Sequence, residues 1–296
     1  ALVGATLLAA CGGGYSSGSS GSGSMSCGAY STCPPPPPPP PTTQTTAVTL
    51  SAAQVFPTPV TAATGSGSIT VDTSSGALSG SVTLSNLPPT AVELSDAYAG
   101  AQGAVVATLT QDAANANRWN IGSGATLNTQ QQADLAAGKL YVLVRTAANP
   151  GGELRGQLLP TGISVKFAAL SGAAEVPPVA STASGQIAVT VNATGLRAAA
   201  NINVAGLVAT GAELASGAAG AVGTQLATLV VDASDPNHFS NDAITLTSTD
   251  VTNYTSGLWY GNVFSAAHPT GELRGQLAPP PPPAPTLTKL QADIFT

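Results

Sequence analysis

Charged and aromatic side chains are scarce in this sequence of 296 residues, at 7% and 4% of the total. Eight Lys and Arg face 14 Asp and Glu, and no basic run occurs, so the positively charged surface that nucleic-acid binding requires is missing. Three Cys, one Met and two His leave few ligands for transition metals and few groups for thiol or imidazole catalysis. We expect His238 and His268 to be solvated on separate polar loops. The composition therefore predicts no nucleic-acid partner, no cofactor and no enzymatic activity.

Small residues are abundant instead, with 33 Gly and 24 Pro, and the net charge is −6. The mean hydropathy is +0.22. Wholesale disorder is associated with high charge and low hydrophobicity, and this chain has neither. Most of the chain is therefore expected to fold, and its length suggests two domains.

A short apolar run, ALVGATLLAAC, occupies residues 1–11 and is too short to span a bilayer. Its last four residues match the bacterial lipobox, in which the cysteine sulfur accepts a diacylglycerol and becomes the first mature residue. We predict that residues 1–10 are part of a lipoprotein signal peptide, truncated at its N-terminus, and that Cys11 is lipidated; a buried strand is the alternative. Gly12 in place of Asp favours the outer membrane if the source is Gram-negative, so the protein is expected in the cell envelope, periplasmic or surface-exposed.

Residues 11–46 are predicted to form a disordered stalk of Gly, Ser and Pro. Cys27 and Cys33 can close a small disulfide loop in an oxidising compartment; two free thiols or an intermolecular pair are the alternatives. The eight prolines of residues 34–41 form a polyproline II rod of about 25 Å, at about 3.1 Å per residue. The stalk would hold the following segment away from the lipid.

The rest of the chain contains a duplication. Residues 103–109 align with 223–229 at an offset of 120, and residues 146–158 align with 265–277 at an offset of 119. The second pair includes ELRGQL, which is identical in both copies. The copies extend over residues 47–160 and 164–279, which is far longer than a solenoid repeat. We therefore predict two tandem domains, called domain 1 and domain 2 below.

Alternating polar and apolar residues indicate half-buried strands in both copies, for example at residues 68–71 and 187–191. One short helix is predicted in domain 1, with Thr129 as N-cap and Gly138 as the C′ residue, and Gly257 ends the equivalent turn in domain 2. A hairpin follows, with strands at residues 140–146 and 153–158. The sequence therefore predicts an all-β class.

The ELRGQL segment is a candidate structural motif. On a strand, Gly156 lies on one face with its Leu neighbours, and Glu153 and Arg155 lie on the other. The spacing favours an ion pair of Glu153 and Arg155 beside a close approach that Gly156 permits. A catalytic pair is the alternative, but no nucleophile or base lies nearby in the sequence. The same roles are predicted in domain 2 for Glu272, Arg274 and Gly275.

The segment AANPGGELRGQL, preceded by LYVLV, together with the opening LSGAAEVPPV at residues 170–179, resembles the CHRD (chordin-type) domain. The resemblance covers both copies. It implies two tandem β-sandwiches, immunoglobulin-like or Cu/Zn-dismutase-like, an extracellular or envelope location and no established catalytic activity.

The histidines typical of this family are missing. Ala-His-Ile-His-x-Gly is replaced by residues 95–100, SDAYAG, in domain 1 and by residues 212–217, AELASG, in domain 2. A later His is replaced by Arg145 and Phe264. A His-x-His strand could bind a metal, as in copper/zinc superoxide dismutases. Without it, we expect no zinc or copper site, and at most a weak site for a hard cation at isolated acidic residues.

Residues 280–296 contain a second Pro-rich spacer followed by a helical apolar stripe. The stripe is a frayed tail, or it resembles the opening helix of bacterial modules that continue into a Cys-x-x-Cys-His haem site. The first functional hypothesis is a lipid-anchored envelope binding and scaffolding protein, attached to the membrane through its lipid, whose non-catalytic domains face a protein or polysaccharide partner. The alternative is an accessory segment of a larger envelope redox protein with a c-type haem.

Overall fold

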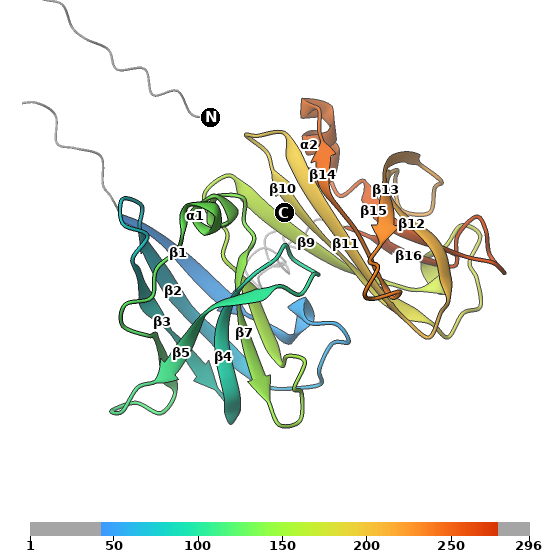
Figure 1. Ribbon diagram of the computed structural model, residues 1–296. Coiled ribbons are helices and arrows are strands. Elements are labelled where there is room, and N and C mark those ends of the chain that lie inside the picture. Colours follow the sequence, from blue (N-terminus) through green and yellow to red (C-terminus); the bar gives the residue numbers. More distant parts are fainter. Residues whose placement is uncertain (1–42, 278–296) are drawn as a thin grey trace, which may run out of the picture. The chain divides into compact units, whose positions relative to one another are not determined.

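The computed structural model describes residues 43–277 (Figure 1). The lipidation of Cys11, the Cys27–Cys33 disulfide and the segment 280–296 lie outside the described residues and stay predictions. The described part of the chain forms sixteen strands, two short α-helices and two 3-10 turns. The predicted all-β class with two tandem domains is therefore confirmed.

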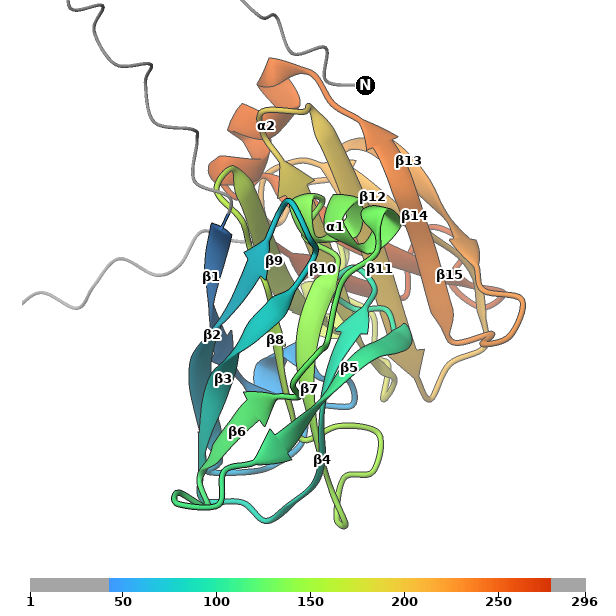
Figure 2. The same ribbon diagram turned by 60° about the vertical axis from the view of Figure 1, so that its left-hand side comes forward.

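Domain 1 contains one antiparallel sheet in the order β1-β2-β3-β6-β5-β4-β7-β8. Its strands are β1 (Thr43–Leu50), β2 (Thr64–Asp72), β3 (Leu78–Ser85), β4 (Pro89–Asp96), β5 (Ala104–Gln111), β6 (Arg118–Ile121), β7 (Leu140–Thr146) and β8 (Leu154–Gln157). The 3-10 turn η1 (Ala52–Gln54) follows β1, and helix α1 (Thr129–Ala136) precedes β7. In Figures 1 and 2 the strands curve around a common core, and α1 lies at one end of the domain.

Domain 2 repeats this topology in the order β9-β10-β11-β14-β13-β12-β15-β16. Its strands are β9 (Ile163–Leu170), β10 (Ser184–Asn192), β11 (Arg197–Ala205), β12 (Ala209–Ser216), β13 (Thr224–Val231), β14 (His238–Thr245), β15 (Trp259–Ser265) and β16 (Leu273–Gln276). The turn η2 (Gly172–Ala174) and helix α2 (Ser248–Thr255) occupy the positions of η1 and α1. The duplication seen in the sequence is thus a duplication of the whole fold.

Each sheet closes on itself just beyond its first strand. In domain 1 the Ser51 amide donates to the Arg155 carbonyl over 2.9 Å, and the Arg155 amide donates back over 3.2 Å. Ser171 and Arg274 form the same pair in domain 2, at 3.0 and 3.1 Å. Closure satisfies backbone groups that open edge strands would expose to pairing with other chains.

The alternating pattern creates a separate core in each domain. In β2, Ile69 and Val71 point inward and are buried, as expected for a half-buried strand, whereas β10 is buried on both faces. Leu and Val dominate the core of domain 1. Domain 2 adds aromatic rings, with Trp259 fully buried and packed edge-on against Tyr254 at 5.2 Å. None of the helices that residues 43–277 form is long and apolar enough to cross a bilayer.

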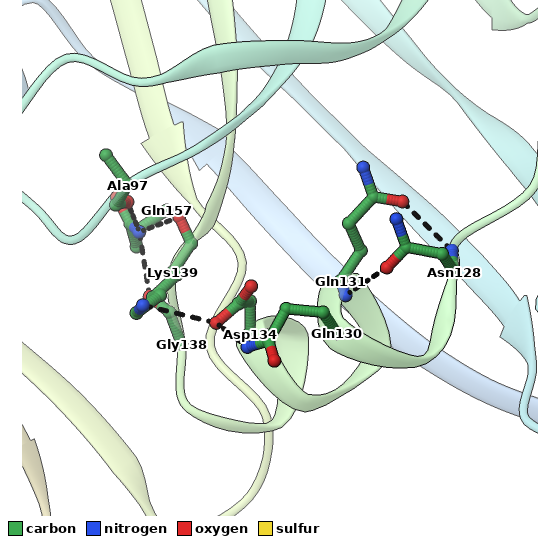
Figure 3. Close-up of polar contacts among 8 residues, drawn as sticks. All are labelled: Ala97, Asn128, Gln130, Gln131, Asp134, Gly138, Lys139 and Gln157. Atoms are coloured by element: carbon green, nitrogen blue, oxygen red, sulfur yellow. Dashed lines mark hydrogen bonds and ion pairs between the residues drawn. The ribbon is translucent and has the colours of Figure 1, made fainter.

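The predicted helix in domain 1 exists, but its N-cap is Asn128 and not Thr129. The Asn128 side chain accepts from the Gln131 amide at 2.9 Å, and the Gln131 side chain accepts from the Asn128 amide at 2.9 Å (Figure 3). These two hydrogen bonds form a capping box, which satisfies two backbone amides at the start of the helix. Gly138 follows the C-cap with φ +78° and Gly257 does so with φ +76°, as predicted for left-handed C′ residues.

Candidate functional site

The Arg side chain of ELRGQL is buried in both domains. In domain 1, Arg155 lies 3.6 Å from the centre of the Tyr141 ring. Its Nη1 donates to the Ala101 carbonyl at 2.6 Å and its Nη2 to the Tyr98 carbonyl at 2.9 Å. Burial lowers the pKa of Arg155 to about 10, which leaves the guanidinium charged at neutral pH. Arg155 therefore holds the loop between β4 and β5 in place.

Domain 2 has the same arrangement. Arg274 is buried and stacks 3.5 Å from the centre of the Tyr260 ring. Its neighbour Gln276 is placed like Gln157 in domain 1. The carbonyl oxygens that accept hydrogen bonds from these two side chains belong to Ala218, Gly217 and Gly257.

The Gln side chain of the motif joins the same loop to the C-terminal end of the helix. In domain 1 the Gln157 Nε2 lies 2.9 Å from the Ala97 carbonyl, 2.7 Å from the Gly138 carbonyl and 2.9 Å from the Lys139 carbonyl (Figure 3). Buried carbonyls without a partner are costly, so a single amide that serves three of them stabilises the loop and the helix end together.

The Glu side chain of the motif binds a different loop. Glu153 accepts from the Thr146 hydroxyl at 2.5 Å, from the Thr61 hydroxyl at 2.7 Å and from the Asn149 amide at 3.2 Å. These bonds lower the pKa of Glu153. In domain 2, hydrogen bonds from Ser265 and Ser181 lower the pKa of Glu272 in the same way.

The expected ion pair of Glu153 and Arg155 is wrong, because no such pair occurs among residues 43–277. Glu153 lies one residue before β8, where the Thr61 and Thr146 hydroxyls donate to it, and Arg155 lies over an aromatic ring. The glycine of the motif allows a close approach. A Cβ on Gly156 would lie 2.6 Å from the Thr49 carbonyl, and one on Gly275 would lie 2.4 Å from the Ala169 carbonyl.

The Arg, Gln, Tyr and Glu side chains are here called the clasp of each domain. The clasp of domain 1 consists of Glu153, Arg155, Gln157 and Tyr141, and that of domain 2 of Glu272, Arg274, Gln276 and Tyr260. The Tyr hydroxyl accepts a hydrogen bond from the backbone of the loop that the Arg holds. In domain 1 the donor is the amide of Gly103, just before β5, at 3.1 Å. The roles of Gln and Tyr were not predicted from the sequence, although both residues recur at the offset of 119.

The predicted alignment of residues 95–100 with 212–217 is wrong by three residues. Glu93 of β4 and Glu213 of β12 occupy the same place, because they pair with Thr108 and Thr228 in equivalent strands. The segments that follow these two strands are rich in Ala and Gly, and such similar residues allowed a shifted alignment. In domain 1 the Glu93 carboxylate forms an ion pair with Arg145 at 3.0 Å.

The prediction of a solvated loop is wrong for His238. This residue begins β14 and is buried, with Nε2 3.0 Å from Asn201 Oδ1 and Nδ1 3.5 Å from the Asp232 carboxylate. His268 lies half-buried in the turn before β16. Within residues 43–277 no group of three or more His, Cys, Asp or Glu is arranged to hold a metal ion.

Two clasp residues of domain 2, Arg274 and Gln276, line a hollow of about 410 Å³. Arg274, Gln276 and Glu175 line its buried part. Small exposed residues form its rim, among them Ala173, Ala174, Pro178, Ala219 and Gly220. The rim therefore consists of η2 with the segment that follows it, and of the loop between β12 and β13, which the clasp holds in place.

Comparison with known families agrees with this duplicated architecture. A family model for the CHRD domain matches residues 46–158 and again residues 167–277. The chain belongs to the CHRD family. Each match contains one closed sheet and one clasp of this CHRD protein. No curated protein and no solved structure matches the chain.

Proposed function

We propose that this protein is a non-enzymatic component of the cell envelope, anchored through a lipidated Cys11, that presents its two CHRD domains to a protein or polysaccharide partner. One observation carries the proposal. In both domains the side chains best suited to chemistry are engaged with the domain's own backbone and hydroxyl groups. The clasp thus maintains the shape of loops.

The electrostatics of the clasp support this role. The guanidinium of Arg155 contacts two carbonyls, a Gln side chain and an aromatic ring, and the carboxylate of Glu153 accepts three hydrogen bonds from neutral groups. The lowered pKa of Glu153 keeps it ionised at neutral pH, whereas a general acid would need a raised pKa. Both groups therefore act as fixed structural charges.

The hollow of domain 2 gives the partner a place to bind. Its volume of about 410 Å³ is in the range of ordinary ligand sites, about 300–1,000 Å³. Loops that are held before binding lose less conformational entropy when a partner binds, and this favours affinity. The rim side chains are small, so a protruding group of the partner, such as a sugar ring or a side chain, can reach the buried part of the hollow.

The alternative hypothesis of an accessory segment of a haem protein depends on residues 280–296. These residues lie outside the described part of the chain. No contact within residues 43–277 favours that hypothesis.

Cosedimentation with peptidoglycan sacculi tests whether the partner is a polysaccharide. The full chain carrying Cys11→Ser, which cannot be lipidated, is compared with the same chain carrying Ala219→Trp, which fills the hollow. Ala193→Trp is the matched control, because Ala193 is equally exposed in a turn away from the hollow. Binding should be lost only with Ala219→Trp. Equal sedimentation of the Cys11→Ser chain and both Trp variants would contradict a role for the hollow. If the Cys11→Ser chain itself does not sediment, peptidoglycan is excluded as the partner and a protein partner is favoured.

A further inference from the structure

Three side-chain oxygens lie close together around Gly271 in domain 2. A Cβ on Gly271 would lie 2.7 Å from Asn262 Oδ1 and 2.8 Å from each carboxylate oxygen of Glu175. Glu175 directly follows η2, and Asn262 lies in the middle of β15. Two elements far apart in the sequence therefore bring a carboxylate and an amide oxygen together.

Two of these oxygens have no hydrogen-bond partner. Glu175 and Asn262 are each 7% exposed, and both Glu175 Oε1 and Asn262 Oδ1 are buried without a donor. The Asn262 amide nitrogen points the other way, toward Glu213 Oε1 at 3.3 Å and the Thr270 carbonyl at 3.5 Å. Buried acceptors that face one another without a donor are costly unless a cation or a proton lies between them.

Domain 1 shows that the fold does not need these oxygens. The equivalent positions hold Val55 and Leu143, and a Cβ on the equivalent Gly152 would meet the Leu143 and Val55 methyl groups at 2.8 and 3.6 Å. The same space is thus apolar in one domain and lined by oxygen in the other. Both residues that line this space are apolar in domain 1 and polar in domain 2, which indicates a role specific to domain 2.

Burial and the neighbouring Glu213 disfavour the ionised form of the Glu175 carboxyl group. Burial raises the pKa of Glu175, the Glu213 charge raises it further, and the Val176 amide, Arg274 and His268 lower it. A carboxylate in such surroundings gains from a cation that offsets both its burial and the neighbouring Glu213. Glu175 also lines the hollow of about 410 Å³, which gives an ion a route from solvent.

From this geometry we infer that domain 2 binds a calcium ion, held by the Glu175 carboxylate and Asn262 Oδ1. All of these ligands are oxygens, which hard cations prefer over the nitrogen and sulfur ligands of zinc and copper. Calcium accepts irregular geometry and completes its shell with backbone carbonyls and water, whereas magnesium needs a near-ideal octahedron. The proposed site combines a carboxylate with an amide oxygen. It is therefore not a group of three or more His, Cys, Asp or Glu, of which residues 43–277 contain none.

Calcium binding is measured directly by isothermal titration and by metal analysis after equilibrium dialysis. The full chain carrying Cys11→Ser is stripped with a chelator and titrated with calcium chloride. We expect one calcium per chain, with a dissociation constant of about 10⁻⁴ to 10⁻³ M, as in extracellular modules. Glu175→Gln should weaken binding by at least about tenfold, because calcium affinity depends on ligand charge.

The double variant Glu175→Val, Asn262→Leu introduces the residues of domain 1, so it is expected to fold, which circular dichroism checks. It should bind no calcium. Glu93→Gln, at the place in domain 1 that corresponds to Glu213, is the control and should bind like the parent. Binding that persists in the double variant overturns the inference. Absence of binding to the parent at millimolar calcium also overturns it, and a proton on Glu175 would then satisfy Asn262.

Discussion

Removal of the Gln157 side chain should destabilise domain 1 more than the removal of a polar side chain usually does. In Gln157→Ala the carbonyls of Ala97, Gly138 and Lys139 lose their common donor at 2.7–2.9 Å. A buried acceptor left without a partner costs about 1–3 kcal/mol, and the three carbonyls share only two N–H groups. We therefore expect a loss of about 2–4 kcal/mol, or about 8–16 °C in Tm at about 4 °C per kcal/mol for a domain of this size.

The chain offers a separate probe for each domain, since Trp119 is the single tryptophan of domain 1 and Trp259 that of domain 2. Thermal and guanidinium unfolding followed by fluorescence, with Trp259→Phe to isolate the signal of Trp119, reports on domain 1. Gln276→Ala is the matched variant. It should lower only the stability of domain 2, and by less, because Gln276 donates to two carbonyls.

Gln102→Ala is the control, because Gln102 is exposed in the loop that the clasp holds. Surface exchanges of this kind usually change stability by less than about 0.5 kcal/mol. If Gln157→Ala has no larger effect than Gln102→Ala, water replaces the amide without cost. The reasoning that the clasp fixes the loops would then be refuted.

Gly156→Ala should destabilise domain 1 by about 1–3 kcal/mol in the same assay, because the added Cβ lies 2.6 Å from the Thr49 carbonyl; an unchanged midpoint would contradict this. Glu153 has a lowered pKa, so its contribution to stability is present above pH 4.5 and is lost as the pH falls below it. Glu153→Gln should flatten this acid dependence, and parallel pH profiles would argue against it. Cys11→Ala should release the protein from membranes in fractionation of the native host, and retention would disprove lipidation. A fragment of residues 47–160 should melt cooperatively with a β-type circular dichroism spectrum, and a helical spectrum would contradict an independent domain.

Much of the fold could be predicted because it follows from local pattern. The strand at residues 68–71 follows directly from alternation, and the left-handed glycines after the helices follow from their conformational freedom. The N-cap was missed by one residue, because Asn128 and Thr129 are both good N-caps and each is followed three residues later by a Gln, so the local sequence does not distinguish them.

The clasp could be predicted only in part. The spacing of Glu153 and Arg155 places them on one face, but their partners come from loops about 50 to 90 residues away, which local pattern does not contain. The role of Gln157 is hidden for the same reason. Comparison of the two copies shows that Gln157 and Tyr141 recur as Gln276 and Tyr260, but recurrence does not show which backbone groups these side chains contact.

Site-specific photo-crosslinking in cells tests the proposed function most directly. A photoreactive amino acid is placed at position 219, on the rim of the hollow, or at position 193 as the control, in the full lipidated chain. The proposal predicts one discrete adduct from position 219, with a protein or a polysaccharide, and none from position 193. Equal labelling from both positions, or no adduct from position 219 in intact cells, would contradict it.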